Sequence, residues 1–295
     1  VLALWLVLAL TSPSIAKTEW KMALGDASGG TQWALGERFA KLVEAYSGGE
    51  ITLALFPNGQ LGSEQETVQN CRLGTLDFSV AAINNITPFS PKVGLFTLPY
   101  LILSVDEAVT LTQGPIGEEL VQETIKAAGV RILGWSYRGF RRLSNSKRPV
   151  TKPADLKGLT IRAPGQAGEV IKALGGTPAP TPMMEVYYAI SKGVIDGEAS
   201  NFETLFAFKF AEVVKYTTSV WQINNPFPFY LVMNKNSYDK LPPDIKSIFD
   251  TLVGEYKERY ILTWNSIDFV GKKFGLSKGV EFVELPPSQL QVWQA

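Results

Sequence analysis

Short apolar runs alternate with longer amphipathic ones from residue 20 onward, and this pattern predicts alternating strands and helices. The first series comprises strands at Trp20–Leu24, Ile51–Phe56 and Leu76–Ala81, separated by helices at Thr31–Tyr46 and Glu64–Leu73. This β-α-β-α-β order predicts a parallel sheet with right-handed crossovers. Ligands bind beyond the carboxyl ends of such strands. We therefore expect one crevice to be faced by the loops at Gly25–Ser28, after Phe56 and at Ala82–Asn85.

A second series of the same kind follows the apolar run Val130–Ser136 and predicts a second α/β lobe. Its expected strands are Leu159–Arg162, Thr177–Ala179 and Ile195–Glu198, and its expected helices are Gln166–Leu174 and Met183–Ser191. A further apolar strand is predicted at Tyr230–Asn234, followed by a helix over Pro243–Phe274. At 1.5 Å per residue this helix is on the order of 45 Å long, so we expect it to lie across both lobes.

The expected fold class is therefore α/β, with two doubly wound lobes around a central cleft and a long helix spanning both. For a chain of 295 residues, a prior of about 150 residues per domain also indicates two domains. We assign residues 17–138 and 226–265 to lobe I, and residues 139–225 and 266–295 to lobe II.

The first sixteen residues have the pattern of a secretory signal peptide that is clipped at its start. Val1–Leu10 is almost entirely apolar, and Ser14 and Ala16 occupy the small-residue positions of a cleavage site. A transmembrane anchor is the alternative, but a spanning helix needs about twenty apolar residues. We expect an exported protein that starts near Lys17, and a single cysteine without a disulfide partner fits a bacterial periplasm.

Charge and composition exclude several classes of function. The 28 basic and 28 acidic residues cancel, so no basic field favours nucleic acid or an anionic membrane. The chain has no histidine, which excludes Ser-His-Asp and Cys-His nucleophiles and most zinc sites. Cys71 lies in a helical run, where a buried core residue is favoured over a reactive thiol. We predict neither a metal site nor a cofactor.

No phosphate loop GxxxxGK[ST] and no GxGxxG motif occurs in the sequence. The nearest glycine-rich run, Gly25–Thr31, lies between a strand and a helix but lacks the lysine. It is therefore interpreted as a turn with a helix N-cap, whose N–H groups can still bind an anion.

Basic residues crowd one short segment of the chain. Arg138, Arg142, Lys147 and Arg148 are expected on a solvated face, as is usual for a run of charges. Arg162 differs because it ends an apolar strand at the edge where the crevice is expected. Its planar guanidinium can bind a carboxylate through two parallel hydrogen bonds.

Four carboxylates lie near strand ends or helix starts, namely Asp26, Glu64, Glu185 and Glu198. A pair of carboxylates working as general acid and base remains an alternative. No spacing singles out such a pair, and capping of helix starts is the favoured interpretation.

The segment 137–164, YRGFRRLSNSKRPVTKPADLKGLTIRAP, resembles the signature of solute-binding proteins of tripartite ATP-independent periplasmic (TRAP) transporters, of the C4-dicarboxylate-binding type. The resemblance extends from residue 20 to residue 285. It includes FPNGQLG at 56–62, GTLDF at 74–78, LPY at 98–100, PAPTPMMEVY at 178–187, GVIDG at 193–197 and YLVMN at 230–234. It implies a fold like that of type II periplasmic binding proteins, which closes around a small organic anion and delivers it to a secondary transporter.

The resemblance also implies a set of ligand-binding residues. Arg162 matches the arginine of the KGLKIR-like motif that binds the substrate carboxylate, and Arg141 matches an assisting arginine in the GFR-like motif. The further expected contacts are Gln166, Ser200, Asn201 and Asn84. The expected partners are a small carboxylate and the membrane subunits of a TRAP transporter. The protein itself is expected to be a monomer without enzymatic activity or membrane insertion after signal cleavage.

Apolar side chains near the expected cleft favour a particular kind of acid. Ala82, Met183, Phe227 and Phe229 indicate a small acid with an apolar or aromatic body rather than a sugar acid, unless these side chains pack in the core. Two other functions remain as alternatives. One is a binding component of an ATP-driven importer or sensor kinase, and the other is a secreted α/β enzyme that uses Glu185 and Glu198.

Overall fold

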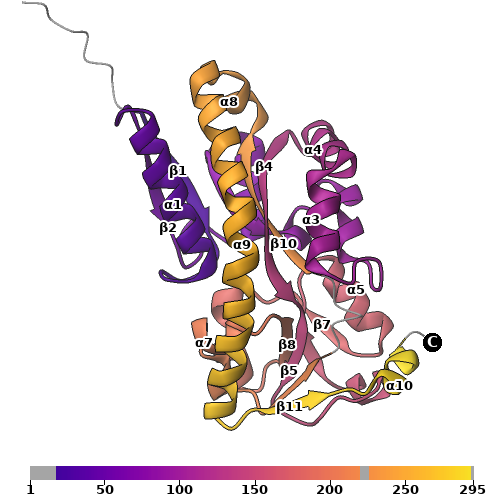
Figure 1. Ribbon diagram of the computed structural model, residues 1–295. Helices are drawn as coiled ribbons and strands as arrows, with labels where there is room; N and C mark the ends of the chain where they lie inside the picture. The colour runs from indigo at the N-terminus through magenta and orange to yellow at the C-terminus, as the bar shows by residue number, and fades with distance from the viewer. Residues whose placement is uncertain (1–17, 220–225, 294–295) are drawn as a thin grey trace, which may run out of the picture.

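The computed structural model describes residues 18–219 and 226–293 and shows two α/β lobes, one above the other in Figure 1. The predicted signal peptide and cleavage site lie outside the described residues. Each lobe is built on one sheet with helices on both faces, as the alternating pattern predicts.

The sheet of lobe I has the strand order β2-β1-β3-β10-β4. Its first three strands pair in parallel, as predicted. The fourth, β10, is antiparallel to both neighbours, so the sheet is mixed rather than parallel. The chain returns from lobe II to form β10, and it therefore enters the sheet from the opposite end. The strands are β1 (Thr18–Leu24), β2 (Ile51–Phe56), β3 (Phe78–Ala82), β4 (Val130–Phe140) and β10 (Pro226–Asn234).

Helices of lobe I cover both faces of this sheet. The ends of α2 are set by local signals: the Ser63 side chain and Glu66 form a capping box, and Gly74 ends the helix with a φ of 75°. The helices of this lobe are α1 (Thr31–Tyr46), α2 (Glu64–Leu73), α3 (Val105–Gln113), α4 (Pro115–Ala128) and α8 (Lys235–Asp239), with 3-10 turns η1 (Ile83–Asn85) and η2 (Pro91–Thr97).

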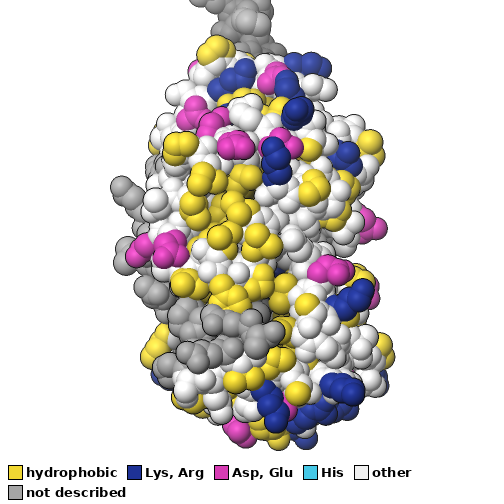
Figure 2. Space-filling model, turned by 90° about the vertical axis from the view of Figure 1, so that its right-hand side faces the viewer, with side chains coloured by type: hydrophobic (Ala, Val, Ile, Leu, Met, Phe, Trp, Pro, Cys, Tyr) yellow, Lys and Arg dark blue, Asp and Glu magenta, His cyan; other side chains and the backbone are white. Residues whose placement is uncertain are grey.

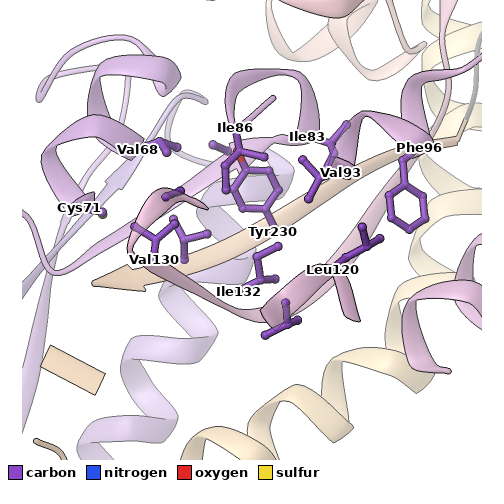
Figure 3. Close-up of a cluster of buried hydrophobic side chains, with 14 of the residues drawn as sticks. Val68, Cys71, Ile83, Ile86, Val93, Phe96, Leu120, Val130, Ile132 and Tyr230 are labelled. Atoms are coloured by element: carbon purple, nitrogen blue, oxygen red, sulfur yellow. The ribbon is translucent and has the colours of Figure 1, made fainter. Parts of the chain in front are cut away.

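A hydrophobic core lies on each face of the sheet. Figure 3 shows the face covered by α2 and α4, where the Tyr230 ring from β10 lies among Ile86 and Ile132. Cys71 belongs to this core and is fully buried, which confirms its prediction as a core residue. On the other face, Phe39 of α1 packs against Phe78 and Phe249.

The sheet of lobe II has the order β11-β9-β5-β8-β6-β7. Strand β8 starts two residues later than predicted, because Ile195 still belongs to the turn after α6, where its backbone N–H donates to the Ala189 carbonyl. The strands are β5 (Arg142–Asn145), β6 (Thr160–Arg162), β7 (Thr177–Ala179), β8 (Gly197–Ser200), β9 (Tyr216–Ser219) and β11 (Glu281–Glu284). The helices and turns are η3 (Pro153–Leu156), α5 (Gln166–Ala173), η4 (Met183–Glu185), α6 (Val186–Ser191), α7 (Glu203–Ala207), η5 (Phe210–Glu212), α10 (Pro287–Leu290) and η6 (Gln291–Trp293).

The long helix α9 (Pro243–Ser277) runs beside lobe I and continues along lobe II, as predicted (Figure 1). It contacts β4 in lobe I and α7 in lobe II. Gly271 permits the second contact, because a Cβ there would lie 2.3 Å from the Phe202 carbonyl oxygen. No helix within the described ranges is long and apolar enough to cross a membrane.

The basic segment is only partly solvated, contrary to the prediction. Lys147 and Arg148 are exposed as expected, but the Arg142 side chain is only 11% exposed. Its guanidinium lies 3.7 Å from Asp268 of α9 and stacks over the Phe202 ring. The prediction for Arg142 was wrong because the partner comes from a distant helix. The Arg138 side chain lies outside the described part of the structure.

Hydrophobic side chains gather on the face of lobe I that carries α3 and α4 (Figure 2). The large exposed hydrophobic residues between η2 and the start of α4 are Leu98, Leu101, Leu103 and Ile116. None of them belongs to the lining of the cavity between the lobes.

Candidate functional site

A cavity of about 460 Å³ lies between the two lobes. Lobe I contributes the loops after β1, β2 and β3, so the crevice predicted from these three loops is confirmed. Lobe II contributes the segments that follow β6 and β7. The cavity lining includes Gly25, Asn58, Ser63, Glu64, Asn85, Arg162, Gly165, Thr181, Met183 and Glu185.

Arg162 is the basic residue of the cavity lining. It ends strand β6 and is 7% exposed, and its Nε donates to the Thr181 carbonyl oxygen at 3.0 Å. Within the described residues, no hydrogen bond engages its two terminal nitrogens. Burial lowers the pKa of Arg162, since it disfavours the charged form. A buried guanidinium with two donors facing a cavity is suited to bind a carboxylate.

Arg141 lies in the gap between β4 and β5, where the chain crosses between the lobes. It is 5% exposed, and its terminal nitrogens donate to the Ala199 carbonyl at 2.5 Å and to Asn84 Oδ1 at 2.7 Å. The second bond joins lobe II to lobe I. Burial and then the positive charge of Arg162 lower the pKa of Arg141 to about 9.

Glu198 is fully buried on β8, opposite Arg162 in the strand register. Its Oε1 accepts a hydrogen bond from the Thr204 hydroxyl at 2.6 Å, and its Oε2 has no hydrogen-bond partner among the described residues. Burial raises the pKa of Glu198 to about 7, although Arg162 and Arg141 oppose the shift. The group therefore exchanges its proton near neutral pH, beside the arginine of the cavity.

Glu64 fixes the lobe I wall of the cavity instead of capping a helix as predicted. Its Oε2 accepts from the Ala82 backbone at 2.8 Å and from Asn85 Nδ2 at 2.5 Å, and its Oε1 accepts from Gln32 Nε2 at 2.7 Å. Burial raises the pKa of Glu64, and the hydrogen bonds from Ala82 and Gln32 oppose that effect. The Glu64 carboxylate at the start of α2 thus connects α1 with the end of β3 and with η1, and it presents negative charge to the same cavity as Arg162.

The six predicted ligand residues all lie between the lobes or at strand ends near the cavity, but only Arg162 belongs to its lining. Asn84 and Arg141 bind each other. The Gln166 side chain accepts a hydrogen bond from the Thr97 hydroxyl of lobe I at 2.8 Å. Ser200 and Asn201 are buried at the end of β8. Direct ligand contact by these five residues stays a prediction.

Sequence reasoning missed Asn85 and Thr181 as cavity residues. Asn85 adjoins the predicted Asn84, so the loop was identified but not the side chain that faces the cavity. Thr181 acts through its backbone carbonyl, which no side-chain motif reveals.

The apolar pocket expected from the sequence is only partly present. Met183 lines the cavity, but Ala82 is buried in the core of lobe I. The side chains of Phe227 and Phe229 lie outside the described part of the structure. The described lining also includes Met184 and three prolines, beside polar residues such as Glu64, Asn85 and Ser63.

The two carboxylates of the alternative enzyme hypothesis occupy different environments. Glu185 is exposed on the cavity wall, whereas Glu198 is fully buried beside the arginines. This arrangement gives no support to a shared acid and base role.

We expect the stability of the protein to depend on the protonation of Glu198. Its pKa rises from 4.5 to about 7 on folding, so the neutral form favours the folded state. This contribution is complete below about pH 4.5 and is lost as the pH rises to about 7. Glu198→Gln keeps a neutral side chain, so the free energy of unfolding of the wild type should fall relative to the variant across this window. Urea denaturation of both proteins at pH 5, 6, 7 and 8 measures the difference. If the free energies of unfolding of wild type and variant differ by the same amount at every pH, the raised pKa of Glu198 is contradicted.

Comparison with known proteins identifies the family. The model of bacterial extracellular solute-binding proteins, family 7, matches residues 27–295. The chain belongs to this family. A solute-binding protein of Verminephrobacter eiseniae is 33% identical over 77% of this chain and 68% of its own length. The 2,3-diketo-L-gulonate-binding periplasmic protein of Escherichia coli is 29% identical over 81% of this chain and 72% of its own length.

A solved structure agrees with this assignment. The TRAP periplasmic solute-binding protein of a Sulfitobacter species, with bound β-D-galacturonate, matches with a TM-score of 0.87 and 27% identity, over 94% of this chain and 92% of that chain. The resemblance to TRAP solute-binding proteins is thus confirmed. The chain is therefore a solute-binding protein, and its family consists of binding proteins rather than enzymes.

Proposed function

We propose that this solute-binding protein captures a hydroxylated monocarboxylate, of the sugar-acid class, between its two lobes. The observation that carries the proposal is Arg162, which lines a cavity of about 460 Å³ and whose terminal nitrogens have no hydrogen-bond partner among the described residues. A carboxylate there forms two charge-assisted hydrogen bonds with this buried guanidinium.

The other polar groups of the lining support a hydroxylated ligand. Glu64 offers carboxylate oxygens as acceptors, and the Ser63 and Asn85 side chains add further polar atoms. A buried hydroxyl without a partner costs about 1–3 kcal/mol, so a polar lining favours a ligand whose hydroxyls it can satisfy. The negative charge of Glu64 opposes a second carboxylate. The E. coli relative and the Sulfitobacter structure, which bind a diketogulonate and a galacturonate, support the same class.

The proposal includes the setting in which the protein works. The mature chain is exported to the periplasm, acts as a monomer and closes around its ligand without turning it over. It then delivers the ligand to the membrane subunits of a TRAP transporter. The family assignment and the signal-like start of the sequence support this setting.

A thermal-shift panel tests the ligand class. We expect D-galacturonate, D-glucuronate and L-galactonate to raise the melting temperature, because a ligand that binds only the folded state stabilises it. Galactarate differs from galactonate by a second carboxylate and should stabilise less. Benzoate and phenylacetate represent acids with apolar bodies. Stabilisation by these two acids, with none by the sugar acids, would overturn the proposed class.

A further inference from the structure

The first turn of α1 is bound by a carboxylate from the other lobe. Glu203 Oε1 accepts a hydrogen bond from the Thr31 backbone N–H at 2.9 Å, and a second one from the Thr31 hydroxyl. Thr31 is the first residue of α1 in lobe I, and Glu203 is the first residue of α7 in lobe II. Their exposed fractions are 9% and 2%. The contact is therefore a buried bond between the lobes.

Helix α1 depends on this contact because its own sequence supplies little capping. Its N-cap is Gly30, which has no side chain, and its first turn contains no acidic residue. Asp26 from lobe I accepts the Gln32 N–H at 3.1 Å, and Glu203 from lobe II accepts the Thr31 N–H. The N-terminus of a helix carries partial positive charge, so a carboxylate is favourable there. The glycine-rich run was predicted to be a turn with a helix N-cap whose N–H groups can still bind an anion, and in the structure the Glu203 carboxylate accepts the Thr31 N–H.

The Thr31–Glu203 contact adjoins both walls of the ligand cavity without lining it. On the lobe I side, Gln32 follows Thr31 and donates to Glu64 of the cavity wall. On the lobe II side, Thr204 follows Glu203 and donates to Glu198, which lies opposite Arg162. Because its two partners belong to different lobes, the contact is made only where the N-termini of α1 and α7 lie together. Movement of one lobe away from the other at this point would break it.

We infer that Glu203 is a latch between the lobes, which binds the N-terminus of α1 on closure and slows ligand release without touching the ligand. The effect on release rests on the proposed function, whereas closure itself can be measured without a ligand. The apparent affinity of a two-state binding protein falls with the fraction of the closed state. Weakening the latch must then weaken binding and speed dissociation.

Glu203→Gln tests the latch because it keeps the shape and one acceptor oxygen but removes the charge. Hydrogen bonds to charged groups contribute more than neutral ones, so D-galacturonate should dissociate about five- to tenfold faster in stopped-flow fluorescence. Thr31→Ala removes only the hydroxyl donor and should give about a two- to threefold increase. Glu281→Gln removes an exposed carboxylate of lobe II and is the matched control. It should leave the rate unchanged.

Lobe separation provides a readout that needs no ligand. Spin labels at Glu44→Cys in α1 and Glu169→Cys in α5 report the distance between the lobes, and the native Cys71 is buried. Without ligand, Glu203→Gln should shift the distance distribution toward the open form, and saturating D-galacturonate should close it again. If the wild-type protein binds none of the three sugar acids of the panel, the proposed ligand class fails, and the unliganded distribution still decides the latch. An unliganded distribution that is the same in wild type, Glu203→Gln and Glu281→Gln would overturn it. If Glu203→Gln does not fold, Thr31→Ala takes its place. An unliganded distance distribution of Thr31→Ala that equals the wild-type one would then overturn the latch.

Discussion

Arg162→Ala should lose most ligand binding while both lobes stay folded. The guanidinium is buried at the end of β6 and lines the cavity, so its removal leaves the ligand carboxylate without its counter-charge. Loss of one partner of a buried charge pair costs about 2–5 kcal/mol, which lowers affinity by about 30-fold to several thousandfold. Isothermal titration calorimetry with D-galacturonate measures the loss.

Two further variants show whether the loss of affinity in Arg162→Ala comes from the guanidinium of Arg162 itself. Arg162→Lys keeps the charge but cannot form two parallel hydrogen bonds, so it should bind much less tightly than the wild type. Arg148→Ala removes an exposed arginine of the same lobe and should bind normally. Unchanged affinity in Arg162→Ala would show that the carboxylate binds elsewhere.

Gly165→Ala should prevent full closure of the lobes. Gly165 precedes α5 with a φ of +53°, and a Cβ there would lie 2.4 Å from the Asn84 carbonyl oxygen of lobe I. A flexible side chain can move away from such a clash, but this atom belongs to the backbone. Overpacking of this kind costs about 1–3 kcal/mol, so affinity should fall roughly ten- to a hundredfold. Calorimetry and the small-angle scattering radius at saturating ligand measure the two effects.

Gly175→Ala is the control for this variant. Gly175 also has a positive φ, of +88°, but a Cβ there would meet no atom of the described residues within 4 Å. The Gly175→Ala variant therefore has the backbone strain of an alanine at positive φ, but it has no clash with the opposite lobe. We expect it to lower the melting temperature and to leave affinity and scattering radius unchanged. Equal affinity losses in the two variants would contradict a role for closure.

Local signals explain how much of the fold was predictable. The bounds of α1, β2 and α2 agree with the predicted ones, because periodicity and caps within each segment determine them. Strand β8 was misplaced because the apolar Ile195 belongs to the turn after α6, where its backbone N–H donates to the Ala189 carbonyl. Arg142 was misjudged because Asp268, its ion-pair partner, lies far along the chain in α9.

The candidate site was predictable only in part, for a similar reason. Arg162 was identified because a strand end and a family motif coincide at one residue. The wall built by Glu64 brings together Gln32 and Asn85, whose positions in space follow only from the assembled sheet. The latch joins residues 172 positions apart, and no sequence pattern relates them.

A crystal structure of the wild-type protein with the most stabilising acid of the panel tests the central claim most directly. We expect the ligand carboxylate to accept hydrogen bonds from both terminal nitrogens of Arg162, in the cavity between closed lobes, with its hydroxyls facing Glu64 and Asn85. A carboxylate bound away from Arg162, or an Arg162 guanidinium turned onto Glu198 with the ligand outside the cavity, would contradict the account.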